Sequence, residues 1–476
     1  MSTHPNIVFI NTDQQTWDAV SAYGNRWLNT PNMDRLVASG TSFMRSYCTD
    51  PVCAPARTSW ATGRYTSEAG VPFNGGHLHD DIPDLGQLLR AGGYGAFHGG
   101  KWHVDGRDVT RSFDTLYYGA RRIGASTGEF YDPAITHAAL QFLTTHDGEA
   151  PFYLQLAFVN PHDVCEYGHN YEEKEIPDAV AQGILREDEL PPLPDNFDYD
   201  PREPLQHRVI RRDDECLIHW KILRKTRRFS ALDWRSFAWN LYRFVEKVDA
   251  EIGLVLDALA ASRFRDDTIV IFTVDHGEAA GQHQMFQKFT LYEESVRVPL
   301  VVASLGDRLP VEKGSRLDHL VSGVDLPATI CDYAGIPAPP RCLGRSLRPL
   351  VEGREVPWRD GVYIESNYWG RALVTATHKY VTEYRPKQVE DYVPPGPDTA
   401  ERGLEQLFDL QADPGETRNL ASDPAQAATL AALRASLATE ERRLERRPLE
   451  PGRPRDVVDQ WGARLRRRWQ TYAEDS

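Results

Sequence analysis

Acidic side chains stand directly after two short apolar runs that lie far apart in the sequence. Residues 6–10, Asn-Ile-Val-Phe-Ile, lead into Asp13. Residues 268–274, Thr-Ile-Val-Ile-Phe-Thr-Val, lead into Asp275 and His276. Runs that are rich in β-branched residues and apolar throughout are typical of strands buried on both faces of a parallel sheet. Because ligands gather at the carboxyl ends of such strands, both clusters are expected to face one crevice.

Two further segments repeat this pattern of polar residues placed after apolar ones. Lys101 and His103 follow the short run 95–98, Gly-Ala-Phe-His. His162 follows residues 152–159, Phe-Tyr-Leu-Gln-Leu-Ala-Phe-Val. The same sheet edge is therefore expected to collect these cationic and imidazole side chains as well.

The order of these segments predicts the fold class. Strand-like runs alternate with helical stretches over residues 1–356, which predicts an α/β domain with a large, mostly parallel sheet sandwiched by helices. Residues 357–476 hold closely spaced strand-like runs and a helical stretch over 427–447, so we expect a smaller C-terminal α+β domain with an antiparallel sheet. Residues 165–235 form a proline-rich, basic insertion, which is a candidate substrate lid or oligomer contact, with a solvated face as the alternative.

Composition limits the partners that the chain can have. Its formal net charge is −15, so nucleic acid, which selects basic faces, is not an expected partner, and an anionic substrate must be attracted by local positive charge. No apolar run approaches the roughly 20 residues needed to cross a bilayer, and residues 1–5 have no export-signal pattern, so we expect a cytoplasmic protein without a membrane partner. The cysteines are scattered and indicate no disulfide framework; they are Cys48, Cys53, Cys165, Cys216, Cys331 and Cys342.

A short motif places a thiol, a proline and an arginine at fixed spacing. Cys53-Ala54-Pro55-Ala56-Arg57 is followed by Thr62 and Gly63, where an extended segment is expected to run into a helix. Alone, the motif could equally be a helix start around a buried thiol. Its significance comes from the other polar clusters that accompany it.

Taken together, these segments resemble the type I, formylglycine-dependent sulfatases of the alkaline phosphatase superfamily. The matching blocks occur in family order over most of the chain, which makes the joint match specific although each block is weak. The resemblance implies an alkaline phosphatase-like fold and a sulfuric ester hydrolase. The blocks are 12–15, 53–57 with 62–63, 100–103, 160–162, 275–278, 288–300, and 408–410 with 413–416.

The residues that could hold a divalent cation are Asp13, Gln14, Asp275 and His276, joined by the side chain at Cys53. Three of the first four offer the hard oxygen atoms that Ca²⁺ and Mg²⁺ prefer. His276 offers nitrogen, and Gln14 stands where many sulfatases carry a second Asp, so Mn²⁺ stays open beside Ca²⁺ and Mg²⁺. Singly, Asp13 could be a helix N-cap and His276 a hydrogen-bonded core histidine.

The resemblance assigns the chemistry of the nucleophile to Cys53. It implies that a formylglycine-generating partner enzyme oxidises Cys53 to formylglycine, whose hydrate attacks sulfur. Pro55 and Arg57 match positions that the maturation enzyme reads, and Arg57 would afterwards support the hydrate and the metal. The expected cofactors are therefore formylglycine and one divalent metal, for which Ca²⁺ is the first choice.

The same resemblance implies roles for the remaining polar residues. Lys101 and Lys288 would clamp the sulfate oxygens as fixed positive charges. His103 would orient or deprotonate the hydrate, and His162 would protonate the leaving group. Ordinary exposed lysines and hydrogen-bonded histidines are the alternatives. A structural role is favoured for His283, and further candidate substrate contacts are Asp163, Cys165, Glu166, His169 and the basic group of the insertion.

The expected substrate is a small anionic sulfate ester, either of a carbohydrate or of another organic sulfate. A phosphonate monoester hydrolase or phosphodiesterase of the same superfamily is the first alternative, because that group often carries Asp-Gln where Gln14 stands here. A non-catalytic binding protein on the same fold is the second alternative. A homo-oligomer is also open.

Overall fold

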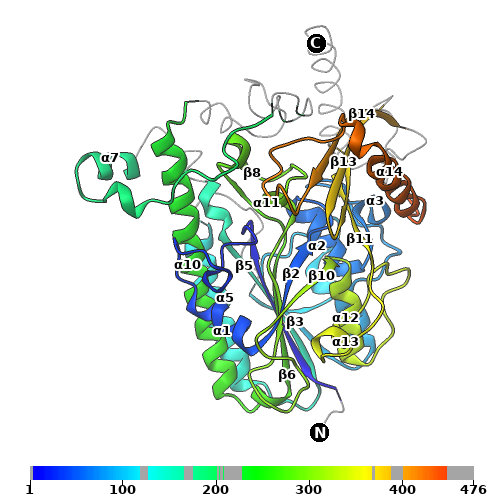
Figure 1. The fold of residues 1–476 in the computed structure, drawn as a ribbon. Helices are drawn as coiled ribbons and strands as arrows, with labels where there is room; N and C mark the ends of the chain where they lie inside the picture. The colour runs from blue at the N-terminus through cyan, green and yellow to red at the C-terminus, as the bar shows by residue number, and fades with distance from the viewer. Residues whose placement is uncertain are drawn as a thin grey trace.

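The computed structural model describes residues 4–117, 127–165, 175–200, 203, 207, 228–366, 370–386 and 400–447. A large central sheet lies between two layers of helices, and a smaller sheet stands beside its upper end (Figure 1). The central sheet has eight strands in the order β10-β2-β9-β6-β1-β5-β3-β4. Their bounds are β1 Asn6–Asp13, β2 Gly40–Tyr47, β3 Gly95–Gly100, β4 Asp114–Tyr117, β5 Phe152–Pro161, β6 Thr268–Val274, β9 Leu300–Ala303 and β10 Ser315–Ser322.

The central sheet is mostly parallel, as the sequence predicted. Only β9 runs against its neighbours, β2 and β6, and every other pair in the sheet is parallel. Both faces of β1 are covered, since Val8 and Ile10 pack into one hydrophobic core while Ile7 and Phe9 pack into another. This two-sided burial is the physical reason why the strand reads as a continuous apolar run.

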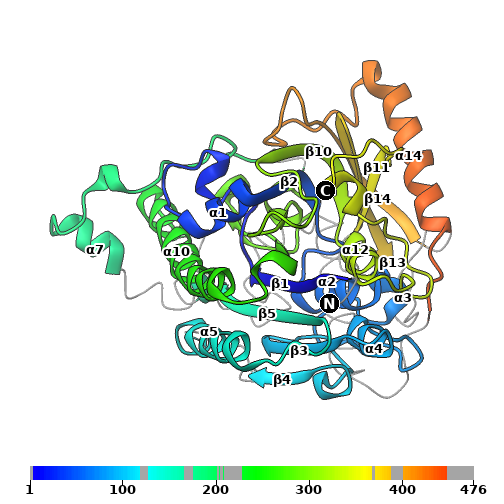
Figure 2. The same ribbon diagram turned by 90° about the horizontal axis from the view of Figure 1, so that it is seen from below.

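Helices cover the two faces in two separate groups (Figure 2). The first core takes residues from α1 Pro31–Ser39, α5 Thr127–Thr145 and α10 Ala231–Ala261. The second takes residues from α2 Cys53–Thr62, α4 Leu85–Ala91 and α12 Asp325–Ala334. Shorter helices are α3 Thr66–Ala69, α7 Glu175–Ala181, α11 Glu293–Val296 and α13 Arg348–Val351, and a two-stranded hairpin joins β7 Ala279–Ala280 to β8 Phe286–Gln287.

Helix α10 is longer than the stretch 243–259 that its amphipathic pattern indicates. It begins after Ser230, whose hydroxyl accepts from the backbone N–H of Asp233 while the Asp233 carboxylate accepts from Ser230. This reciprocal capping satisfies backbone groups at the helix start and extends the helix N-terminally. No helix among the described ranges combines the length and the apolar character that a bilayer crossing needs.

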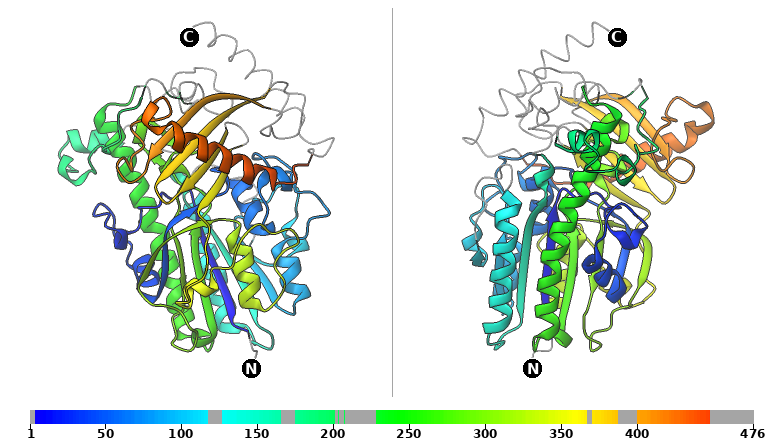
Figure 3. Two further views of the ribbon diagram at one scale, coloured as in Figure 1. Left: turned by 45° about the vertical axis from the view of Figure 1, so that its right-hand side comes forward. Right: turned by 90° about the vertical axis from the view of Figure 1, so that its left-hand side faces the viewer.

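The predicted antiparallel sheet at the C-terminal end is present, in the order β11-β12-β13-β14. Helix α14 lies across one face of this sheet (Figure 3). Leu430, Leu433 and Leu437 of that helix pack against Tyr380 and Leu407 of the sheet. The strands are β11 Gly361–Ser366, β12 Gly370–Thr375, β13 His378–Pro386 and β14 Ala400–Asp409, and α14 spans Ala427–Arg442, shorter than the stretch 427–447 expected for it.

The insertion 165–235 is described only in part. Helix α7 lies away from the body of the molecule, at the left of Figure 1. Of the basic group in the insertion, Arg228 is described, while Arg208, Arg211, Arg212, Lys221, Arg224, Lys225 and Arg227 lie outside the described residues, as does Cys216. The lid and oligomer interpretations and the boundary at residue 357 stay predictions.

A buried charge cluster joins the small sheet to helix α11. Lys379 of β13 is fully buried, and its Nζ lies 3.1 Å from Glu293 Oε1 and 2.8 Å from Glu416 Oε1. The backbone N–H of Glu293 donates to Glu416 Oε2. Burial, reinforced by the Glu416 carboxylate, raises the pKa of the neighbouring Glu294 to about 8. The junction therefore contains a carboxyl group that resists ionisation at neutral pH.

This raised pKa predicts a pH-dependent difference in stability between the wild type and Glu294→Gln. Between the unfolded pKa, near 4.5, and the folded value of about 8, the folded wild type keeps a proton that the unfolded chain has lost. Its unfolding free energy therefore falls as pH rises, whereas the glutamine of the variant does not titrate. We expect the advantage of the variant to grow by about 3 kcal/mol from pH 5 to 8 and to level off at higher pH. Urea denaturation of both proteins at four pH values measures this difference in unfolding free energy. A difference between Glu294→Gln and the wild type that stays constant with pH would contradict the prediction.

Candidate active site

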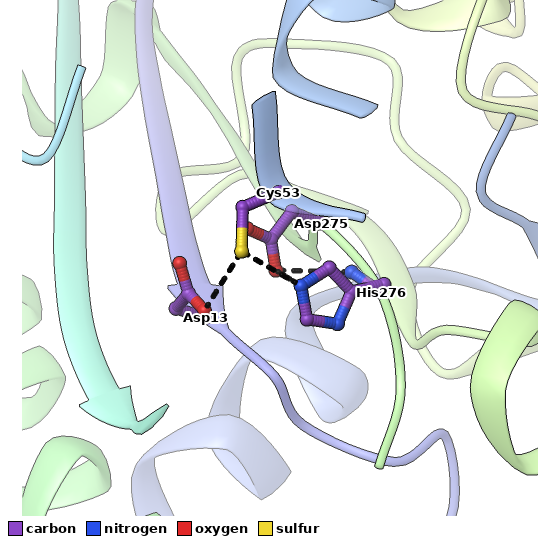
Figure 4. A group of neighbouring side chains, drawn as sticks. All are labelled: Asp13, Cys53, Asp275 and His276. Atoms are coloured by element: carbon purple, nitrogen blue, oxygen red, sulfur yellow. Dashed lines mark hydrogen bonds and ion pairs between the residues drawn. The ribbon is translucent and has the colours of Figure 1, made fainter. Parts of the chain in front are cut away.

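Four side chains from three distant segments meet at the carboxyl end of the central sheet (Figure 4). Strands β1 and β6 are parallel neighbours with Thr12 beside Val274, so Asp13 and Asp275 leave the sheet side by side. One ligand atom from each of Asp13, Cys53, Asp275 and His276 lies within 4.8 Å of the others, and all four residues are buried. The predicted convergence of the two acidic clusters is therefore observed.

Helix α2 brings the thiol and the arginine of the short motif to this cluster. Every residue of the helix is buried, and Cys53 and Arg57 lie one turn apart on the same face. The Cys53 sulfur is 3.1 Å from His276 Nε2 and 3.9 Å from Asp13 Oδ1. The Arg57 guanidinium donates at 2.9 Å to both Asp13 Oδ2 and Asp275 Oδ2. A planar fork between two carboxylates holds them at a fixed separation.

Two buried lysines complete the positive lining of the site. Lys101 follows β3, and its Nζ donates to Asp13 Oδ2. The preceding Gly100 has φ 106°, and a Cβ there would lie 2.2 Å from the carbonyl oxygen of Ala157, so only glycine lets the chain turn Lys101 inward. Lys288 follows β8, and its Nζ lies 3.1 Å from Cys53 Sγ and 2.7 Å from Gln14 Oε1.

These charges shift the pKa values of the two groups that matter most. Burial alone would raise the pKa of Asp13, but Lys101, with help from Arg57 and Lys288, holds it well below the ordinary value. Burial and the Asp13 charge likewise disfavour a thiolate, yet Lys101 and Lys288 outweigh them and lower the pKa of Cys53 well below its usual range. The site therefore stabilises negative charge at the position of the Cys53 sulfur.

The two carboxylates of the cluster differ in their environment. Burial and the neighbouring Asp13 charge raise the pKa of Asp275, while Arg57 and His276 oppose this shift. The pKa of His276 is lowered by burial, but Asp275 reverses the shift and raises it. A divalent cation bound between the two carboxylates and the imidazole would offset the repulsion between the carboxylates. Their oxygen and nitrogen atoms are ligands that fit Ca²⁺ or Mn²⁺. The residues present fit a metal site.

Gln14 also lies beside the cluster, and its side-chain amide contacts Lys288, Glu278 and Cys165. Its Oε1 accepts from Lys288, and its Nε2 donates to Glu278 Oε2 and lies 3.4 Å from Cys165 Sγ. Its backbone N–H donates to Asp275 Oδ1 at 3.1 Å. Gln14 thus contacts the site through Asp275 and Lys288, and its role as a metal ligand stays a prediction.

The two predicted histidines are less buried than the four clustered residues. His103 is partly exposed, and its Nε2 is 4.0 Å from Asp105 Oδ2. His162 begins the short helical turn His162–Val164 after β5 and is half-buried. Burial lowers the pKa of His162 to about 3; Asp13 opposes this shift, while Lys288 and Lys101 reinforce it. His162 is therefore neutral before an anion binds.

Comparison with known proteins identifies the family. The sequence pattern of the family described as Sulfatase matches residues 5–336. This chain belongs to the sulfatase family. A second pattern, described as N-sulphoglucosamine sulphohydrolase, C-terminal, matches residues 281–443. The family resemblance seen in the sequence is thus confirmed, and the protein is a sulfuric ester hydrolase.

Individual relatives cover nearly the whole sulfatase. The Delta 4,5-hexuronate-2-O-sulfatase of Bacteroides thetaiotaomicron is 28% identical over 91% of this chain and 88% of its own. A solved 2-O GAG sulfatase has a TM-score of 0.74 at 25% identity and covers 96% of each chain. The phosphonate monoester hydrolase of Agrobacterium radiobacter has a TM-score of 0.71 at 22% identity, covering 92% of this chain and 96% of its own, which is a likeness of fold. The predicted alkaline phosphatase-like architecture is confirmed.

Other candidate residues of the sulfatase have different surroundings. Asp163 accepts from the backbone N–H groups of Gly128 and Glu129 at the start of α5. His283 stacks on the Tyr292 ring at 3.9 Å. Cys165 lies between the amides of Gln14 and Gln287. Glu166 and His169 lie outside the described residues.

Sequence reasoning assigned no role to two residues that support the site. Asn74 Oδ1 accepts from the backbone N–H of Ala54 at 3.0 Å and so anchors the first turn of α2. Glu278 is fully buried and accepts from the Gln14 side chain and the Gln287 backbone. Burial raises the pKa of Glu278 to about 7, and its two donors oppose the shift. The only signal for Glu278 in the sequence was its position two residues after His276. Its contact with Gln14 could not be predicted, because the two residues are far apart along the chain.

Proposed function

We propose that this sulfatase hydrolyses a sulfate ester of a sulfated carbohydrate, using formylglycine made from Cys53 and one bound divalent metal. The observation that carries the proposal is the position of the Cys53 sulfur, which lies against His276 and Lys288 within the cluster that holds Asp13 and Asp275. Carbohydrate specificity is supported by relatives named for hexuronate and GAG sulfate esters.

Asp13, Asp275 and His276 would hold the metal together with the modified side chain at position 53, with Gln14 as a further candidate. The cation would neutralise negative charge on the sulfate group and on the attacking oxygen. Ca²⁺ is the first choice, with Mn²⁺ and Mg²⁺ as alternatives. The aldehyde hydrate would supply the attacking hydroxyl, and a formylglycine-generating partner enzyme would have to make it.

The remaining residues act on the substrate itself. Lys101 and Lys288 are buried, and their ammonium groups contact Asp13 and Cys53, so they would bind the non-bridging oxygens of the sulfate group and hold the sulfur close to the nucleophile. His103, which lies beside Asp105, would orient the attacking hydroxyl group or accept its proton. His162 would give a proton to the leaving oxygen, and the charge of the bound sulfate ester would favour its protonated form.

Paired assays test the proposal. The purified protein, coexpressed with a formylglycine-generating enzyme, is expected to hydrolyse 4-nitrophenyl sulfate faster than the 4-nitrophenyl monoester of phenylphosphonate. Both esters are monoanions, but the sulfate offers three non-bridging oxygens to the two lysines, whereas the phosphonate offers two and a phenyl group in place of the third. A panel of sulfated mono- and disaccharides, assayed for released sulfate, then identifies the sugar. Faster phosphonate hydrolysis would favour the sister activity, and binding without turnover would favour a non-catalytic protein.

The proposed role of His162 predicts a dependence on the leaving group. In His162→Ala, kcat for an alkyl or sugar sulfate is expected to fall about 10²-fold or more, because a poor leaving group needs the proton. The loss on 4-nitrophenyl sulfate should be under about tenfold, since nitrophenolate leaves without protonation. Steady-state rates on both substrates measure the difference. Equal losses would contradict proton donation by His162.

A further inference from the structure

Lys288 is linked through Gln14 to Glu278, a residue that makes no direct contact with Cys53. Lys288 Nζ donates to Gln14 Oε1 at 2.7 Å and to Cys53 Sγ at 3.1 Å. The other end of the Gln14 amide, Nε2, donates to Glu278 Oε2. Glu278, Gln14 and Lys288 therefore form one chain of hydrogen bonds that ends at position 53.

Glu278 also holds the backbone that carries Lys288. Its second oxygen, Oε1, accepts from the backbone N–H of Gln287, the residue before Lys288. The two segments are already joined in the β7–β8 hairpin, where Ala279 pairs with Gln287. Glu278 is fully buried, so water does not compete for these bonds.

We propose that Glu278 is a positioning residue that fixes Lys288 by two routes, through the Gln14 side chain and through the Gln287 backbone. An amide group can point either end at a neighbour. In the structure both Glu278 oxygens accept, Oε2 from Gln14 and Oε1 from the Gln287 backbone, so Glu278 takes the NH₂ end of Gln14 and leaves the amide oxygen for Lys288. A reversed Gln14 would direct N–H groups at the ammonium and push Lys288 out of place. The inference rests on the proposed function, in which Lys288 binds sulfate oxygens.

The test is the affinity for inorganic sulfate, measured by titration calorimetry on Glu278→Gln and, as a more drastic variant, Glu278→Ala. A glutamine side chain at this position keeps the volume but cannot accept from both Gln14 and Gln287, since its own NH₂ would face one of these donors. We expect the Kd for sulfate to rise about tenfold, as for loss of one hydrogen bond to a charged group.

A double-mutant cycle separates positioning from general damage. Lys288→Met alone should weaken sulfate binding at least as much as Glu278→Gln, and the double variant should be no worse than Lys288→Met, because Glu278 acts through Lys288. In the matched pair, the effects of Glu278→Gln and Lys101→Met on the free energy of sulfate binding should add, since Lys101 donates to Asp13 and makes no bond to Glu278. Asp249→Asn, which removes another buried carboxylate that accepts from Met33 and Asn32, controls for lost stability and should leave the Kd for sulfate unchanged.

The outcomes are distinct. An unchanged Kd in both Glu278 variants, or full additivity with Lys288→Met, would overturn the positioning role while leaving the sulfatase proposal intact. A wild type that releases no sulfate from any ester and binds no inorganic sulfate would overturn the proposed function and this inference with it.

Discussion

Cys53→Ala is expected to lower kcat for sulfate ester hydrolysis by about 10⁴-fold or more, with little change in folding. Alanine removes the only atom at this position that could become the nucleophile, and knocking out an enzyme nucleophile has effects of this order. The fall in kcat should be far greater than the fall in substrate affinity, because Lys101 and Lys288 are still present to bind the sulfate group. The side chain is small, so α2 should stay packed.

Rates on 4-nitrophenyl sulfate measure the effect, and Cys331→Ala is the matched control. Cys331 is another fully buried thiol, on α12 outside the cluster, and its replacement should leave kcat unchanged. Mass spectrometry of the wild-type peptide bearing Cys53 should reveal loss of sulfur and gain of an aldehyde. Cys53→Ala retaining turnover within tenfold of wild type would exclude this residue as nucleophile, and an unmodified thiol in fully active enzyme would exclude formylglycine.

Asp13→Asn is expected to lower kcat by about 10³-fold and to reduce the metal content of the protein. Asp13 is the carboxylate that both Arg57 and Lys101 contact, and it is one of the four residues that would hold the cation. An amide of the same size keeps the packing but loses the negative charge. The metal would then be bound by one carboxylate fewer, and the loss of an electrostatic group of this kind costs rate rather than substrate affinity.

The measurement pairs kcat with metal content by elemental analysis. Asp325→Asn is the control, because Asp325 is also a fully buried carboxylate that pairs with a guanidinium, that of Arg359, outside the cluster. It should lose stability but keep metal and kcat. Removing metal from the wild type with a chelator and restoring Ca²⁺, Mn²⁺ or Mg²⁺ separately identifies the cation. Full metal content and normal rate in Asp13→Asn would contradict a metal site at Asp13.

Several features of the fold were open to prediction because they depend on local patterns. The centres of the two strands, residues 7–10 and 269–272, are continuously apolar, and a strand needs such a run only when both of its faces are covered. Parallel pairing then places both strand ends at one edge, so the convergence of these residues follows from the strand direction. The four-residue spacing of Cys53 and Arg57 likewise predicts that both side chains share one face of a helix, since four residues are about one helical turn.

Other features needed long-range information. The role of Gln14 as a metal ligand stays a prediction, but nothing in the sequence shows that its amide contacts Lys288 and Glu278, more than 260 positions away along the chain. The direction of a flexible side chain depends on which partners the fold places within reach. The extension of α10 to Ala231 likewise depended on the Ser230 cap in addition to the hydrophobic pattern.

The amino-acid sequence alone determined the family and the class of sheet, and it named the candidate reactive side chains, because strand periodicity, motif spacing and residue chemistry are all local properties. Only the tertiary structure decided how these side chains share protons and charge. Lys101 and Lys288 lower the pKa of Cys53, Arg57 bridges two carboxylates, and Glu278 reaches Lys288 through Gln14. Electrostatic interactions and hydrogen bonds depend on separations of a few ångströms between segments far apart in the chain, and folding alone sets those separations.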